Sequence, residues 1–336
     1  MTLAAVSLIV LLVLSACNGQ APAVPTATAT PTNDPDPVLN DPTQVPSPTS
    51  PPGWVWLVAA PGSDSASLAA IQNWLESQAA LAGLQFEVIE AYPGADTDPT
   101  PRIVVFLTAP EDAANLAASA PNTQFLIVTD QNIEPTANLS VIRNPAVQQA
   151  FIAGFIATLV APDFRSGGLF SGEDTLSQDA YLNGGRYLCG RCIPVYAPVV
   201  LFPQVNSLNL DGGESSWKEA FDTLNLNRIQ VLYLPPPTLE AEFLDYLISL
   251  NIKLLGTQPP AEEYRTAWVA TVAADLQGAL DQAWPGLVAG DGGKTIAASL
   301  KLNDVNDSLL TPGKLRMVEQ LMDELRDGWI EPLSVP

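Results

Sequence analysis

The residues of this chain that most readily suggest chemistry are Cys189 and Cys192, in the segment YLCGRCIP. A CxxC spacing is typical of thiol–disulfide oxidoreductases, in which one thiolate attacks a disulfide. Those enzymes hold the pair at a helix N-terminus, where the helix dipole lowers the thiol pKa. Here the pair falls at the C-terminal end of a predicted helix, where the dipole raises the pKa instead. We therefore predict a structural disulfide between the two cysteines and not redox catalysis.

The chain contains no histidine among its 336 residues, which bears on every class of catalytic or metal site. Histidine is the commonest general base and the commonest transition-metal ligand in proteins. Its absence excludes Ser-His-Asp and Cys-His catalysis, and two cysteines alone do not make a zinc site. We therefore expect a protein that is not an enzyme and that uses no metal and no cofactor.

The charge balance is strongly acidic, with 36 acidic residues against 14 basic ones and a formal net charge of −22 at pH 7. Such a surface repels phosphate backbones and anionic lipid headgroups. We therefore expect no nucleic-acid partner.

Candidate ligand contacts are the polar side chains that follow predicted strands, because α/β sheets bind ligands at the carboxyl ends of their strands. Two aromatic residues join them, since an aromatic ring can stack on a flat base or a sugar. The candidate ligand-binding residues are Ser63, Asp64, Ser65, Asp130, Gln131, Phe170, Glu173, Asp174, Trp217 and Gln258.

Several of these candidates have a second explanation that needs no ligand. Those at 63–65 suit a helix N-cap, and those at 173–174 suit the cap of the following helix equally well. Those at 130–131 lie in TDQN, which is a good Asx-turn sequence. For the two aromatic residues, packing in the core is the favoured alternative.

The candidate residues lie in or next to apolar strands that alternate along the chain with amphipathic helices. This order implies βαβ units and parallel sheets that are covered by helices on both faces. The predicted strands are 53–60, 84–91, 102–109, 123–130, 138–143, 166–172, 196–204, 228–236 and 252–258. The predicted helices are 65–83, 110–119, 145–161, 175–191, 215–225 and 238–251.

The alternation restarts near residue 165, which predicts two lobes of similar construction. We expect an α/β protein with two doubly wound parallel-sheet lobes joined by a hinge, and a ligand crevice where the strands end. The predicted boundaries are 53–164 for the first lobe and 165–336 for the second, with part of 262–290 crossing back to the first lobe.

The N-terminus carries an uncharged apolar run, residues 3–16, that ends directly before Cys17. The run is short for a bilayer span and has the length of a signal-peptide core. Leu14-Ser15-Ala16-Cys17 looks like a bacterial lipobox, although no Lys or Arg precedes the apolar run. We predict a signal peptide over 1–17 and lipidation of Cys17.

Residues 18–52 are rich in Pro and Thr and show neither helical nor strand periodicity. Such a composition predicts a disordered linker with polyproline II character. Together with the lipobox, it places the folded domain outside the cytoplasm, anchored by lipid to a bacterial cell membrane. In such an oxidising compartment a disulfide persists.

The segment NPAVQQAFIAGFIATLVAPDFRSGGLFSGEDTLSQDAYLNGGRY, residues 144–187, resembles the core of the basic membrane lipoprotein family. The matching parts are Gln149–Ala157, Ser166–Gly172 and Tyr181–Tyr187. Members of that family are substrate-binding lipoproteins of ABC importers with the type I periplasmic-binding fold, several of them for nucleosides. The resemblance implies a monomer that binds a small polar ligand, by default a nucleoside, between two lobes and delivers it to an ABC permease. The alternative is a ligand-sensing or interaction lipoprotein with the same fold and no part in transport.

Overall fold

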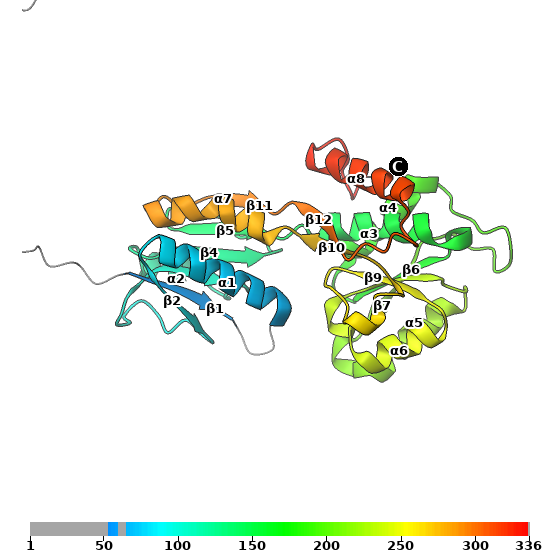
Figure 1. The fold of residues 1–336 in the computed structure, drawn as a ribbon, viewed down its shortest axis with the longest axis horizontal. Coiled ribbons are helices and arrows are strands. Elements are labelled where there is room, and N and C mark those ends of the chain that lie inside the picture. Colours follow the sequence, from blue (N-terminus) through cyan, green and yellow to red (C-terminus); the bar gives the residue numbers. More distant parts are fainter. Residues whose placement is uncertain (1–52, 60–64, 335–336) are drawn as a thin grey trace, which may run out of the picture. The chain divides into compact units, whose positions relative to one another are not determined.

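The computed structural model describes residues 53–59 and 65–334, without the side chains of residues 65–67 and 211. Two six-stranded sheets organise this part of the chain, each with its own helices (Figure 1). We call the sheet that begins with β1 and its helices the first lobe, and the sheet that begins with β6 and its helices the second lobe.

All strands of the first sheet are parallel, in the order β11-β5-β4-β3-β1-β2. The strands are β1 (Trp54–Val58), β2 (Gln85–Ile89), β3 (Pro101–Phe106), β4 (Gln124–Thr129), β5 (Leu139–Arg143) and β11 (Thr295–Ala297). The helices are α1 (Ser65–Leu81), α2 (Ala113–Ser119) and α7 (Leu276–Ala289).

Successive residues of the first sheet's strands pack into two different cores, as the two-residue period of a strand requires. Val55 and Leu57 of β1 pack in the core that includes residues of α1 and α7. Trp56, between them, packs in the core that includes residues of α2. Helices therefore cover both faces of this sheet, which is why its central strands β1, β3, β4 and β5 are mostly apolar.

The second sheet has the order β12-β10-β9-β8-β6-β7, parallel except for the antiparallel edge strand β12. Its strands are β6 (Ser166–Ser171), β7 (Gln204–Leu208), β8 (Val231–Leu234), β9 (Lys253–Gly256), β10 (Trp268–Ala274) and β12 (Leu300–Asn303). Its α-helices are α3 (Ala146–Val160), α4 (Thr175–Cys189), α5 (Gly213–Asn225), α6 (Ala241–Ser249) and α8 (Pro312–Arg326). Short 3₁₀ helices span Pro162–Phe164, Leu210–Gly212, Pro236–Thr238 and Glu262–Tyr264.

The two lobes exchange segments along the chain. Helix α3 follows the first sheet in sequence but packs in the core of the second lobe, together with residues of α4 and α8. Helix α7 and strand β11 follow the second lobe's strand β10 but belong to the first lobe. The division of residues between the lobes thus differs from a single boundary at 164/165, because α3 lies before that boundary and α7 and β11 lie after it.

One predicted strand is wrong. The structure has no strand over 196–203, and β7 begins only at Gln204. Pro198 and Pro203 lie in this segment, and proline supplies no backbone N–H to a sheet ladder. The apolar residues that suggested a strand lie instead in an irregular loop.

Candidate functional site

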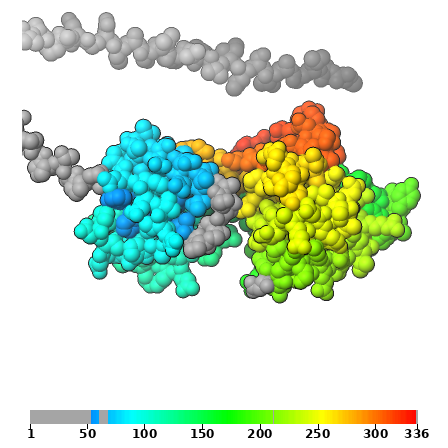
Figure 2. All heavy atoms as spheres, turned by 60° about the horizontal axis from the view of Figure 1, so that its bottom comes forward, coloured from blue at the N-terminus to red at the C-terminus, as the bar shows by residue number. Residues whose placement is uncertain are grey.

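Three segments pass between the lobes, and they are hydrogen-bonded to one another. They lead from β5 to α3, from β10 to α7 and from β11 to β12. The amide of Ala298 donates to the carbonyl of Arg143 at 3.0 Å, and the amide of Asp275 donates to the carbonyl of Ser299 at 2.7 Å. These bonds tie the three segments into one connection between the sheets, which Figure 2 shows in part as orange atoms between the cyan and the yellow-green lobes.

A cavity of about 360 Å³ lies beside this connection, between the carboxyl ends of strands from both sheets. The first lobe contributes residues after β3 and β5 together with α1, and the second lobe contributes residues after β8 and β9. Such a position, at strand ends and between two lobes, is where α/β proteins bind small molecules. The lining residues are Leu68, Ile71, Leu107, Thr108, Val128, Asn144, Gln149, Pro236, Thr257, Gln258, Ala273, Ala274 and Leu276.

Two amide side chains in this lining differ in how their polar atoms are paired. Gln149 of α3 is buried and donates from Nε2 to the carbonyl of Val272 at 2.9 Å, so it links α3 to β10. Asn144, at the end of β5, has a buried Oδ1 that accepts no hydrogen bond. A buried acceptor without a partner is costly, so Asn144 is the lining residue with the greatest demand for a donor from a ligand or a water.

A second cavity of about 260 Å³ continues along α1. It shares five lining residues with the first cavity: Ile71, Thr257, Ala273, Ala274 and Leu276. Its lining includes one basic residue, Lys301, whose Nζ lies 3.3 Å from Oδ1 of Asp275. Asp275 also accepts from the amide of Gly278 and so caps α7. The charge of Lys301 is thus already paired. No Arg or Lys is among the residues that line the first cavity.

Among the predicted ligand contacts, Gln258 lines the first cavity. Asp130 and Gln131 are exposed just after β4, and the amide of Gln131 donates to Oγ1 of Thr129 at 3.0 Å, within a turn. Glu173 and Asp174 are also exposed, after β6. Asp174 accepts from the amide of Ser177 at 3.1 Å and is the N-cap of α4. None of these four lines either cavity.

The two aromatic candidates lie in the core of the second lobe and not at the cavity. Phe170 is 2% exposed and stacks on Tyr233 with ring centroids 5.0 Å apart. Trp217 is 7% exposed and packs edge-on against Phe243 at 6.0 Å. The positions at a strand end and a helix start are as predicted, but both side chains turn inward, so neither is retained as a ligand platform.

Tyr233 also lies 5.8 Å from Tyr181 by ring centroids, next to Phe170. Burial raises the pKa of both tyrosines, and nearby Asp174 raises the pKa of Tyr233 further. Tyr181 donates its hydroxyl to the carbonyl of Gly167 at 2.5 Å. Both phenols are therefore neutral at physiological pH, and their role is to pack the second lobe.

The structure does not describe the side chains of the remaining candidates. Ser63, Asp64 and the predicted lipidation site Cys17 lie outside the described residues. Ser65 begins α1, but its side chain is not among those described. Their predicted roles stay predictions.

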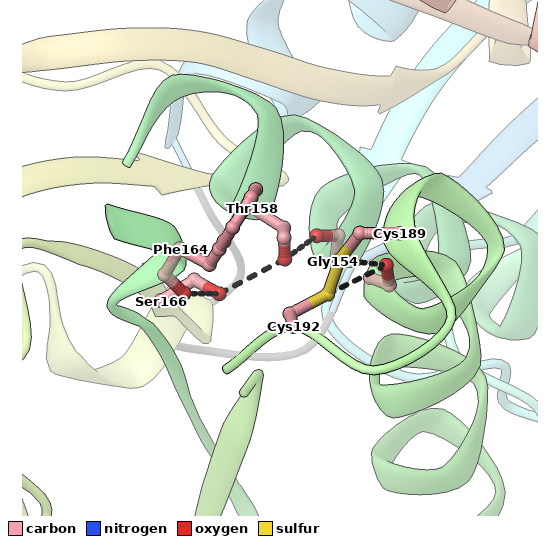
Figure 3. The surroundings of a disulfide bond; sticks show 7 residues. Gly154, Thr158, Phe164, Ser166, Cys189 and Cys192 are labelled. Carbon is pink, nitrogen blue, oxygen red and sulfur yellow. Dashed lines mark hydrogen bonds between the residues drawn. A yellow bond between two sulfur atoms is a disulfide. The ribbon is translucent and has the colours of Figure 1, made fainter. Parts of the chain in front are cut away.

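The structure joins Cys189 and Cys192 by a disulfide whose Cα atoms are 5.5 Å apart (Figure 3). Cys189 is the last residue of α4, and Cys192 is fully buried. Both Sγ atoms lie within 3.5 Å of the carbonyl oxygen of Gly185, one turn back along the helix. The disulfide closes the end of α4 against the loop that follows, and it lies away from both cavities.

Four polar residues of the first cavity were missed in the sequence: Thr108, Asn144, Gln149 and Thr257. Gln149 lies inside α3, but the other three follow strands, so the rule that selected Asp130 applied to them as well. Asn144 stands directly after predicted strand 138–143 and before a proline, which was the signal available for it.

Within the described residues no helix is both long and apolar enough to cross a membrane. The same residues contain no group of three or more His, Cys, Asp or Glu side chains placed to hold a metal ion.

The chain matches no protein-family model and no curated protein. It does resemble solved structures. An ABC transporter solute-binding protein from Conexibacter woesei superimposes with a TM-score of 0.62 at 13% identity, covering 84% of this chain and 98% of that one. A solute-binding protein of an ABC transporter system from Aeropyrum pernix gives 0.59 at 14% identity, with 84% and 93% covered.

A transcriptional activator of the comK gene from Bacillus halodurans is similar to the same degree, with a TM-score of 0.61 at 11% identity and coverage of 81% and 96%. At these identities the likeness shows the fold. The chain is an α/β protein with two parallel-sheet lobes that match the type I periplasmic-binding proteins, and the predicted fold class is confirmed. Membership of the basic membrane lipoprotein family stays a prediction.

Proposed function

We propose that this protein is a membrane-anchored, extracytoplasmic solute-binding protein of an ABC importer. The observation that carries the proposal is the cavity of about 360 Å³ at the carboxyl ends of strands from both lobes. Two solute-binding proteins of ABC transporters with the same fold support it. The predicted lipid on Cys17 and the predicted linker 18–52 would hold the monomeric domain near its permease.

The mechanism follows from how the cavity is built. The first lobe offers Thr108 and Asn144, and the second lobe offers Thr257 and Gln258. A ligand that bonds to both sets stabilises the conformation in which the lobes are close, and so shifts the population toward it. The three hydrogen-bonded crossing segments are the hinge about which this closure occurs.

The chemistry of the lining limits the ligand. A carboxylate or phosphate ligand needs a cationic partner, whereas the first cavity has none among its lining residues and the Lys301 of the second is paired with Asp275. The unpaired Oδ1 of Asn144 calls for an N–H or O–H donor. No Asp or Glu lines the first cavity either, and a buried cation needs an anionic partner by the same rule. The ligand is therefore uncharged, partly apolar, and carries a donor. A nucleoside, which the family resemblance implies, belongs to this class.

A second function is favoured by one observation: the transcriptional activator from Bacillus halodurans has the same fold at a TM-score of 0.61. A ligand-sensing lipoprotein would use the same cavity and the same closure but would have no permease partner. A gene for a permease and one for an ATPase beside the gene for this chain would favour the importer.

Thermal-shift screening tests the ligand class. Panels of nucleosides, neutral sugars, amines, carboxylates and phosphates are compared on the purified protein. A ligand present at a hundred times its Kd adds about 2.7 kcal/mol to the free energy of unfolding. We expect hits only among the nucleosides and neutral sugars, and hits confined to the charged compounds would contradict the proposed lining chemistry. The absence of any hit across the panels would contradict both functions.

A further inference from the structure

The loop 190–203, between α4 and β7, exposes an unusual density of large apolar side chains. It projects from the second lobe as a green segment (Figure 1). Exposed apolar residues are common singly, but a group of them in one segment marks a surface that something else covers. The exposed members are Ile193 (42%), Val195 (79%), Tyr196 (75%), Val199 (63%) and Leu201 (56%).

The loop is held in shape by bonds to the body of the lobe. The disulfide fixes its start, and the amide of the buried Phe202 donates to the carbonyl of Cys192 at 2.9 Å. Arg165 donates to the carbonyl of Tyr196 at 2.6 Å. The amide of Val195 donates to Oδ1 of Asp163 at 2.8 Å. The apolar side chains are therefore presented in advance, so docking needs little further ordering of the chain.

The charge of this region is opposite to that of the chain. Residues 180–210 contain no Asp or Glu, although the chain has 36 of them. The same stretch carries Arg186 and Arg191, both exposed. Two acids from other segments approach it. Asp163 lies 3.5 Å from Arg165 and is paired with it, and Glu324 of α8 accepts from the hydroxyl of Tyr187 at 3.4 Å. The loop is thus a basic and apolar surface on a chain of net charge −22.

The loop also lies at the end of the second lobe that the ligand does not use. It leads into the amino end of β7, whereas the cavities lie at the carboxyl ends of the strands. Docking of the second lobe through this loop therefore leaves the two lobes free to open and close around the cavity.

We propose that loop 190–203 docks the second lobe on an anionic lipid surface. The apolar side chains and the ring of Tyr196 enter the interfacial layer, and Arg186 and Arg191 contact the anionic headgroups. The net charge of −22 opposes adsorption of the whole surface. Charges farther than about 8 Å from the headgroups are screened at physiological ionic strength. The local charge of the loop therefore determines whether this part of the surface is attracted to the lipid. This inference does not depend on which solute the cavity binds.

Sedimentation with vesicles tests it on residues 51–336, the compact unit that contains both sheets. Omitting residues 1–50 removes the predicted lipid anchor as a source of binding. The vesicles are phosphatidylcholine, alone or with about one-third phosphatidylglycerol. We expect binding to the anionic vesicles that falls about tenfold in the double variant Val195→Asp with Val199→Asp, and severalfold in Arg191→Glu. Added salt should weaken the binding.

Leu81→Asp is the control, because this leucine is 82% exposed at the end of α1, on the first lobe. It should bind as the unaltered protein does, and an unchanged thermal melt shows that every variant is folded. An equal loss in the control variant, or no binding of the unaltered protein, would overturn the proposal. So would self-association that the loop variants abolish in the absence of vesicle binding, since the partner would then be a second copy of the chain.

Discussion

The helix pairs on the two lobes are built in different ways. In the second lobe, α3 and α4 approach closely through glycines: a Cβ on Gly154 would overlap the carbonyl oxygen of Tyr181, and one on Gly184 would overlap that of Phe151. In the first lobe, α1 and α7 meet through large side chains. Trp74 and Trp284 pack edge-on at 5.7 Å, and Trp74 Nε1 donates to Asp281 at 3.1 Å.

This difference separates a rigid part from an adjustable one. Backbone-to-backbone contact tolerates no change in spacing, because carbonyl oxygens cannot move aside as side chains do. Helix α3 carries Gln149 into the cavity wall, so the wall on that side is fixed by the α3–α4 contact. Helix α1 also lines the cavity, but it rests on aromatic side chains that have alternative rotamers.

The largest expected effect comes from filling the glycine contact. Gly184→Ala should lower the free energy of unfolding by about 3 kcal/mol, because the new methyl overlaps a backbone oxygen. Gly172→Ala is the control, since its nearest neighbour would be 3.9 Å away. Denaturant unfolding measures both. A loss in Gly184→Ala as small as that in Gly172→Ala would show that the helices can separate at little cost.

Removal of the disulfide should have the next largest effect. The bridge closes a short segment, with a sequence separation of 3, so it constrains the unfolded chain by about 2 kcal/mol. Reduction, or Cys189→Ala with Cys192→Ala, should therefore destabilise the second lobe by that amount. Hydrogen exchange should speed up at the end of α4 and not in α1 or α7. Equally faster hydrogen exchange in both lobes would contradict a stabilising role of the disulfide that is confined to the second lobe.

Alkaline pH should weaken the second lobe more than the first. Burial raises the pKa of Tyr181 and Tyr233 above the ordinary value of 10.0. The neutral phenols are favoured by folding, so their contribution is complete below pH 10 and is lost as pH rises toward the folded pKa. Between the ordinary pKa of 10.0 and its raised pKa in the folded protein, each tyrosine lowers the free energy of unfolding by about 1.4 kcal/mol per pH unit.

The measurement is the free energy of unfolding between pH 8 and pH 12, with Tyr181→Phe compared against Tyr92→Phe of the first lobe. Tyr181→Phe should flatten the alkaline decline more, although it also loses the bond to Gly167. A decline unchanged by Tyr181→Phe would show that this phenol is not the group responsible.

The smallest effect is expected at the α1–α7 contact. Trp74→Phe retains an aromatic ring against Trp284 but loses the hydrogen bond to Asp281, at an expected cost of about 1 kcal/mol or less. Thermal unfolding measures it, with Asp281→Asn as the variant that keeps an acceptor. A loss as large as that of Gly184→Ala would remove the contrast between the two helix pairs.

The architecture could be predicted because parallel strands buried on both faces leave a strong pattern, as in TQFLIVTD around β4. The irregular loop 196–203 could not, because its apolar side chains match a strand while its prolines prevent pairing. The sequence analysis placed part of 262–290 in the first lobe, where α7 packs. It did not foresee the pairing of β11 with β5, because that pairing joins distant segments and no local period encodes it.

The predicted ligand contacts stay predictions. The cavity proposed as the site lies at strand ends, and Gln258 is the predicted contact that lines it. The sequence favoured charged and aromatic residues there, whereas the lining uses Thr108, Asn144 and Thr257. Phe170 shows the reason: a residue at a strand end faces either the cavity or a helix, and only the packing of α3 and α4 decides which.

The central claim is that the cavity between the lobes binds a small uncharged molecule. The most direct test is to identify, by mass spectrometry, the compound released from the purified protein and to titrate it back by calorimetry. Binding should weaken about tenfold in Asn144→Leu, which removes the unpaired acceptor, and should be unchanged in Asn73→Leu, an exposed position on α1. Equal affinity in Asn144→Leu and the unaltered protein would contradict the account.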